Sequence, residues 1–240
     1  MDIQLILKEI REFFRKNADP EIREKYSRYF KGEYPGYGID QKKFETRRDK
    51  WIDELSGLST GYILSIGDEL MKSGKYEESS LAIQLIAARR NDFSAEVFNH
   101  IARWFDTGID NWAATDTLCM FVTAELVRDG HVSLDELGKW TEAESEWQRR
   151  TVPVTLYELA KKKEVAPGKA LPLVRPLMMD KSEYVQKGIG TMLRELWKTH
   201  PDEIEDFLYE FKDTAPRPIY AYATEKMDKE KRKRFKKNKK

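Results

Sequence analysis

The chain has 240 residues, of which 40% are hydrophobic and 35% are charged, and its formal net charge is +1. No run approaches the roughly 18 consecutive apolar residues of a membrane-spanning helix, so we expect no membrane partner. Cys119 is the only cysteine, which excludes intramolecular disulfides and cysteine-rich zinc sites. A reducing, cytoplasmic setting is the default expectation for such a chain.

Charge is unevenly distributed along the sequence. The last ten residues, KRKRFKKNKK, hold eight basic and no acidic side chains, which leaves the first 230 with 35 basic and 42 acidic ones. We therefore expect residues 231–240 to be a disordered basic tail, either simply solvated or able to displace counterions from a polyanion. The body has a net charge of −7, so any surface for a polyanion must be local.

Helical periodicity dominates the first half of the chain. Residues 2–16 place Ile3, Ile6, Leu7, Ile10, Phe13 and Phe14 on one stripe. Pro20 opens a helix at 20–31, since proline is favoured in a first turn, and GEYPGYG at 32–38 is a loop. Further helices are expected at 40–55, 59–72, 76–89, 94–106 and 111–128.

The second half continues the same pattern. Ser133 and Glu136 have the spacing of a capping box for a short helix. A long helix is expected at 141–163, followed by a loop at 165–172 that leads into a short helix. The last helices are expected at 182–198, 201–212 and from Pro216 or Pro218 onward.

These elements predict an all-α fold, a HEAT-like or armadillo-type α-solenoid of stacked antiparallel helix pairs. No segment alternates apolar and polar residues convincingly, so no sheet is expected. We expect a single domain over residues 1–230, because no stretch is long enough to be a linker. We also expect a monomer. A helical bundle with a closed core is the alternative.

Few residues have the spacing of a catalytic or metal-binding motif. The sequence contains no nucleophile elbow, phosphate loop or zinc signature, so we expect no metal and no cofactor. His100, His131 and His200 are isolated, and a structural role is expected for each.

The segment TGIDNWAATDTLCMF places a tryptophan and a carboxylate on one helical face. Trp112 and Asp116 are four residues apart, and most apolar residues of this helix lie elsewhere around it. In the next such segment, SEWQRRTVPV, Trp147 and Arg150 are three apart. Each tryptophan can instead be a core residue with incidental charges nearby. In a solenoid, however, equivalent faces line up and would present these groups together.

Four segments, in order along the chain, resemble the DNA alkylation repair family of HEAT-like proteins, the AlkD-type DNA glycosylases. They are RYFKGEYPGYGI (28–39), the segment from Trp112 to Asp116, WQRR (147–150) and YVQKGIGTMLRELWKTHPDEI (184–204). The resemblance implies double-stranded DNA as partner, contacted mainly through its backbone, and a nucleoid-associated location if the source is prokaryotic. It also implies hydrolysis of the N-glycosidic bond of N3- or N7-alkylated purines without base flipping.

The resemblance implies a role for each candidate site residue. Asp116 would stabilise positive charge on the sugar and orient water, Trp112 would pack against the sugar, and Arg150 would grip a phosphate. Further DNA contacts are expected from Tyr29, Arg47, Arg48, Arg89, Arg90, Trp147, Arg149, Lys187 and Arg194.

The sequence departs from the family at one position expected to hold a second tryptophan, where it has Thr191. This departure favours an alternative, a non-catalytic DNA-binding protein that prefers bent, branched or damaged DNA. The acidic body leaves open a third hypothesis, a scaffold for another protein.

Overall fold

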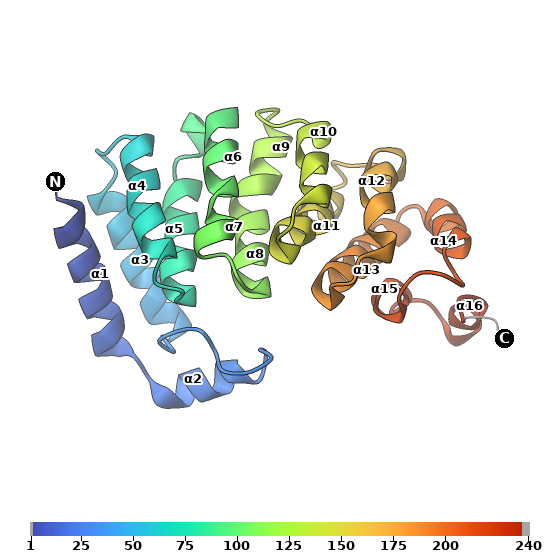
Figure 1. The fold of residues 1–240 in the computed structure, drawn as a ribbon, viewed down its shortest axis with the longest axis horizontal. Helices are drawn as coiled ribbons and strands as arrows, with labels where there is room; N and C mark the ends of the chain where they lie inside the picture. Colours follow the sequence, from blue (N-terminus) through green and yellow to red (C-terminus); the bar gives the residue numbers. More distant parts are fainter. Residues whose placement is uncertain (1, 237–240) are drawn as a thin grey trace. The chain divides into compact units, whose positions relative to one another are not determined.

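The computed structural model describes residues 2–236, which form helices and turns and include no strand. The prediction of an all-α, HEAT-like fold is therefore confirmed (Figure 1). No helix in this part of the chain is both long and apolar enough to traverse a bilayer. The chain divides into two compact units, residues 1–122 and 123–240, which we describe separately as the N-terminal and C-terminal units.

The N-terminal unit begins most of its helices where a short polar side chain caps them. Asp19, Asp40, Ser59, Ser94 and Asn111 each accept a hydrogen bond from a backbone N–H of the following turn. The helices are α1 (Ile3–Asn17), α2 (Pro20–Ser27), α3 (Gln41–Glu54), α4 (Thr60–Met71), α5 (Tyr76–Ala87), α6 (Ala95–Ala102), α7 (Trp104–Thr107) and α8 (Trp112–Leu118). The predicted helix at 94–106 is thus split into α6 and α7.

These helices pack in two layers. Helix α5 packs against α4, α3 and α8, while α4 also contacts α1 and α7 (Figure 1). Gly67 lets α4 approach the ring of Trp104, because a Cβ there would lie 2.8 Å from that ring. The Trp104 indole N–H donates to Asp68 at 2.7 Å, so a fully buried aromatic residue has its polar atom satisfied. The layer containing α3, α5 and α8 positions the candidate site of this unit.

The predicted helix at 111–128 continues past α8 through a π-helical turn (Cys119–Thr123) into α9. The C-terminal unit contains α9 (Ala124–Arg128), α10 (Leu134–Gly138), α11 (Glu146–Lys161), α12 (Pro167–Val174), α13 (Glu183–Trp197), α14 (Pro201–Glu210), α15 (Arg217–Ala223) and α16 (Lys229–Arg234). Helix α13 packs between α11 and α15, and α12 contacts α10 and α14. The predicted capping box of Ser133 and Glu136 is present at the start of α10.

Two predicted boundaries in this unit differ from the structure. The helix expected at 141–163 begins at Glu146, because the Ser145 hydroxyl caps it by accepting from the backbone N–H of Gln148. The loop expected at 165–172 becomes helical at Pro167, which occupies the first turn of α12.

The structure also differs from the expected disordered tail over residues 231–236. Lys231 belongs to α16, and its ammonium lies 2.9 Å from Glu205, which also pairs with Arg234 at 3.3 Å. Phe235 is buried against Tyr209 and Tyr220. An apolar anchor and an ion-pair cluster therefore hold this part of the basic segment, while residues 237–240 lie outside the described part of the chain.

Candidate nucleic-acid interface

Helix α8 presents Trp112 and Asp116 on one face. Its other face is committed to the core, since Thr115 and Leu118 are fully buried. The Asn111 side chain caps the helix by accepting from the backbone N–H of Ala114 at 2.9 Å, which fixes where the first turn starts. Trp112 and Asp116, one turn apart, are both half-buried. The predicted pair therefore shares a partly solvent-facing surface.

The loop that follows α2 fixes the orientation of the Trp112 indole. The indole N–H donates to the backbone carbonyl oxygen of Tyr29 at 3.2 Å, and the ring of Phe30 lies 5.5 Å from that of Trp112. The Tyr29 side chain, another predicted DNA contact, is 66% exposed. The structure therefore places the backbone of Tyr29 against Trp112, which lies one helical turn from Asp116.

A buried carboxylate at the start of α5 holds this loop in place. Glu77 is only 4% exposed, and its Oε1 accepts from the hydroxyl of Tyr34 at 3.1 Å and from the backbone N–H groups of Gly38 and Ile39 at 2.9 and 3.3 Å. Its Oε2 accepts from the N–H of Tyr37 at 2.9 Å. Gly38 adopts φ of +80°, the left-handed region that favours glycine. Burial, together with Glu77, raises the pKa of Tyr34, which keeps its hydroxyl a donor.

The next residue provides a second anchor for the same loop. The buried Glu78 accepts from the hydroxyl of Tyr37 at 2.7 Å and from Nε of Arg11 at 3.1 Å. The sequence reasoning missed both glutamates. In the sequence, these glutamates are simply two acidic residues in the first turn of a helix, ahead of an apolar run. Acidic residues are common in a first turn because they interact favourably with the helix dipole, so the pattern does not indicate a buried anchor.

The two predicted arginines of α3 are engaged within the protein. Arg47 pairs with Glu9 and, at 2.9 Å, with Glu54, and its guanidinium lies 4.6 Å from the ring centroid of Trp51. These carboxylates raise the pKa of Arg47 against the opposing effect of burial. Arg48 pairs with Asp49 at 2.7 Å and donates to the amide oxygen of Gln84 at 2.7 Å. A phosphate would have to compete with these partners.

Arg89 closes the C-terminal end of α3. Its guanidinium donates to the backbone carbonyl oxygens of Leu55 and Ser56 at 2.6 and 2.7 Å, two groups that the end of a helix leaves without an intrahelical partner. Arg90 lies in a 3₁₀ turn (Arg90–Asp92) and is exposed.

In the C-terminal unit, Trp147 and Arg150 both contact the start of α13. The ring of Trp147 lies 4.7 Å from that of Tyr184, and Nη1 of Arg150 donates to the backbone carbonyl oxygen of Tyr184. Arg150 is only 9% exposed. The predicted pair is therefore adjacent, but its arginine is largely covered by the protein.

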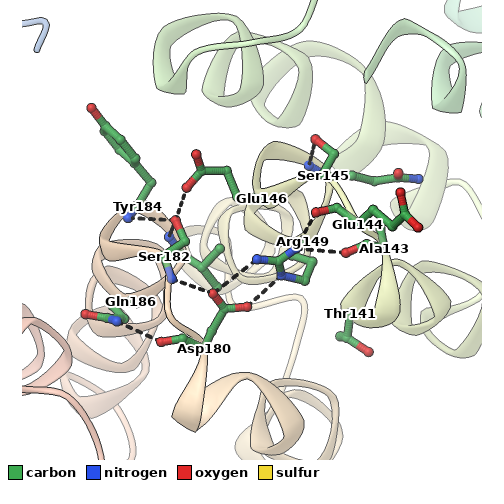
Figure 2. Close-up of polar contacts among 12 residues, drawn as sticks. Thr141, Ala143, Glu144, Ser145, Glu146, Arg149, Asp180, Ser182, Tyr184 and Gln186 are labelled. Atoms are coloured by element: carbon green, nitrogen blue, oxygen red, sulfur yellow. Dashed lines mark hydrogen bonds and ion pairs between the residues drawn. The ribbon is translucent and has the colours of Figure 1, made fainter. Parts of the chain in front are cut away.

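Arg149 joins the start of α11 to the start of α13, as Figure 2 shows. Its Nε and Nη2 donate to the buried carboxylate of Asp180 at 2.6 and 3.3 Å, and its Nη1 donates to the carbonyl oxygens of Ala143 and Glu144 at 2.8 and 2.7 Å. Asp180 in turn accepts from the backbone N–H of Ser182 at 2.7 Å. This geometry gives Arg149 a structural role.

The remaining predicted cations lie on α13. Lys187 pairs with Glu183 at 2.7 Å, and Arg194 pairs with Glu225. Thr191 lies between them in sequence and is half-buried. A metal-binding cluster of three or more His, Cys, Asp or Glu side chains is absent from residues 2–236.

Solved structures show the same fold at low sequence identity. A protein described as a predicted DNA alkylation repair enzyme from Enterococcus faecalis is 20% identical, with a TM-score of 0.75 over 89% of this chain and 98% of that one. AlkD2 from Streptococcus mutans is 18% identical, with a TM-score of 0.59 over 86% of this chain and 99% of that one. No curated protein matches the sequence. The family model for DNA alkylation repair enzymes matches residues 10–227, and the chain belongs to this family.

Proposed function

We propose that the protein is a DNA glycosylase that hydrolyses the N-glycosidic bond of N3- or N7-alkylated purines. The observation that carries the proposal is the placement of Trp112 and Asp116 on one half-exposed face of α8, with the indole held by the carbonyl of Tyr29. Membership of a DNA alkylation repair family supports DNA as the partner.

Alkylation makes the base cationic and therefore a good leaving group, so the reaction needs little general acid catalysis. The charge that develops in the transition state lies on the deoxyribose, which gains oxocarbenium character. A carboxylate beside that sugar, supplied by Asp116, stabilises it and orients the attacking water. Trp112 packs against the sugar, and the hydrogen bond to Tyr29 limits how far the indole can turn.

Contact with the DNA backbone, rather than extrusion of the lesion, completes the proposal. Arg150 would hold a phosphate through its planar guanidinium, and the ring pair of Trp147 and Tyr184 would lie beside that contact. Because Arg150 is only 9% exposed, this contact would require its side chain to move toward the phosphate.

Release of 7-methylguanine from methylated duplex DNA, measured by chromatography, tests the proposal. Wild-type protein should release the base, and Asp116→Asn should lower the rate at least a hundredfold, the size typical for losing an electrostatic catalytic group. Asp106→Asn is the matched control, since Asp106 is an exposed carboxylate of the same unit. No release by wild type, or equal release by wild type and Asp116→Asn, would contradict the proposed mechanism.

Thr191 favours a second candidate function, DNA binding without excision. The resemblance implies a tryptophan at this position, and a threonine offers no aromatic wall to a sugar. This candidate predicts saturable, salt-sensitive DNA binding with no release of base. If Thr191 accounts for the missing excision, Thr191→Trp should produce detectable base release, whereas unchanged absence of release would show that this position does not account for it.

A further inference from the structure

A cavity of about 260 Å³ lies in the N-terminal unit. It is lined by residues of α2 and the segment after it, of α3 and α5, and of the end of α8 with the π-helical turn that follows. Aromatic rings form much of its wall: Tyr26, Tyr34, Phe44, Tyr76 and Phe121. The ring of Tyr34 is 5.3 Å from that of Tyr26 and 5.9 Å from that of Tyr76, in edge-to-face contacts. Phe121 is 39% exposed, so one ring of the wall also faces solvent. Such walls suit a flat, unsaturated ligand.

One wall of the cavity is polar and has a fixed hydrogen-bonding direction. Arginine can only donate, so Arg48 orients the amide oxygen of Gln84 toward itself, and the Gln84 NH₂ group donates to Ser80 at 2.9 Å. Gln84 and Ser80 are 8% and 4% exposed. The hydroxyl of Ser80, as an acceptor from Gln84, retains its own proton for donation, and Gln84 retains a second N–H. This wall presents donors.

A different part of the lining presents acceptors. Gln41 donates its amide N–H to Glu45 at 2.7 Å, which leaves the amide oxygen of Gln41 and the second carboxylate oxygen of Glu45 available. A ligand that fits both sides therefore carries acceptors on one edge and donors on another. Aromatic walls with donors and acceptors around the ring edge match a nucleobase.

The cavity adjoins the candidate catalytic face of α8. Thr117 of α8 and Met120 of the π-helical turn that follows line it, so the cavity lies at the C-terminal end of the helix that carries Trp112 and Asp116. Aromatic contacts also connect the two places, since Phe30 lies 5.5 Å from Trp112 and 5.2 Å from Tyr34. Met120 is 48% exposed, so the cavity has a solvent-facing rim.

We propose that this cavity binds a single unpaired nucleobase of DNA held along α8. A volume just below the about 300 Å³ at which drug-sized pockets begin suits one base rather than a base pair. The base is one that is already unpaired, so the lesion itself need not leave the stack. This inference rests on the proposed DNA contact of Trp112 and Asp116, and it adds a preference for DNA with an unpaired nucleotide.

Fluorescence anisotropy with three labelled duplexes tests the assignment. One duplex is fully paired, one has a single bulged adenine, and one has an abasic bulge that keeps the extra backbone unit but lacks the base. We expect the protein to bind the bulged adenine about tenfold more tightly than the abasic bulge, the effect of one base–aromatic contact. Equal affinity for the two bulged duplexes would overturn the proposal.

Two variants and one control locate the effect. Phe121→Ala and Gln84→Met should each reduce the preference for the bulged adenine about fivefold or more while leaving affinity for paired DNA unchanged. Phe121 is exposed, so its variant should fold even if the buried Gln84→Met does not. Tyr209→Ala removes another exposed aromatic ring, one that does not line the cavity, and it should keep the preference. A full preference in Phe121→Ala would contradict the assignment.

Two further measurements separate the alternatives. Free deoxyadenosine, titrated by calorimetry, should show no saturation up to millimolar concentration, whereas micromolar saturation would assign the cavity to a soluble nucleoside instead. Release of 7-methylguanine is measured in parallel. Release without a bulge preference would overturn the cavity assignment alone, and a bulge preference without release would overturn only the glycosylase proposal.

Discussion

Replacement of Glu77 by glutamine tests whether this buried carboxylate holds the loop that supports Trp112. The amide can keep its oxygen toward the three donors at Oε1, which are the hydroxyl of Tyr34 and the N–H groups of Gly38 and Ile39. Its NH₂ group then faces the N–H of Tyr37, so one donor opposes another.

The expected loss follows from these contacts. An unsatisfied, largely buried donor costs about 1–3 kcal/mol, and three hydrogen bonds change from charge-assisted to neutral, so we expect a total of about 3 kcal/mol. Because the lost contacts belong to the loop, its opening should be affected before the whole unit unfolds. The amides of residues 37–39 should exchange with solvent about a hundredfold faster.

Amide hydrogen exchange of wild-type and Glu77→Gln protein measures this loss. Glu33→Gln is the matched control, because Glu33 belongs to the same loop but its side chain is 89% exposed and pairs with Arg23 at the surface. That variant should change protection by less than about 0.5 kcal/mol. Unchanged exchange at residues 37–39 in Glu77→Gln, or an equal effect in Glu33→Gln, would refute the role assigned to Glu77.

Three further predictions concern the C-terminal unit. Arg149→Met leaves the buried carboxylate of Asp180 without its guanidinium and should lower the free energy of unfolding by about 3 kcal/mol in urea titrations. Gly190→Ala should lower the free energy of unfolding by about 2 kcal/mol or more, because a Cβ would lie 2.6 Å from the carbonyl oxygen of Ile219. Its control, Gly168→Ala, has open space around the added Cβ and should raise the free energy of unfolding by up to about 1 kcal/mol. Burial would raise the pKa of Glu205, but hydrogen bonds from Trp197 and Lys231 and the cations of α16 lower it overall. The ionised carboxylate therefore stabilises the folded state above pH 4.5, and this stabilisation is lost as the pH falls through the lower folded pKa. Proteolysis of α16 should rise at acid pH.

Local signals predicted many of the helices because their first turns carry their own side-chain caps. Ser59, Asn111 and Ser133 satisfy backbone N–H groups within their own first turns, and such short-range chemistry is visible in sequence. The start of α11 was misplaced because the residues before Ser145 form a 3₁₀ turn (Lys139–Glu142) that continues the apolar pattern.

Side-chain partners far apart in sequence could not be predicted in the same way. Periodicity places Arg47 on a face of α3 but does not show that Glu9 opposes it from α1. The same limit applies to Glu77, whose partners lie about forty residues earlier. The shared face of Trp112 and Asp116 could be predicted because both residues lie within one helix.

The ion pairs of α3 determine which of its cationic side chains are available to bind DNA phosphates. Arg47 and Arg48 are paired with carboxylates, whereas Lys42, Lys43 and Lys50 make no ion pair with another described residue and line an open groove of about 540 Å³. Each phosphate that a free cation neutralises releases counterions and steepens the salt dependence of binding by about 0.9 in log–log slope. Glutamine at all three lysines should therefore flatten the slope for duplex DNA by about 3, while glutamine at Arg47 should leave it unchanged. The reverse result would mean that the arginine pairs break on binding, and that the intramolecular partners seen here are exchanged for phosphates.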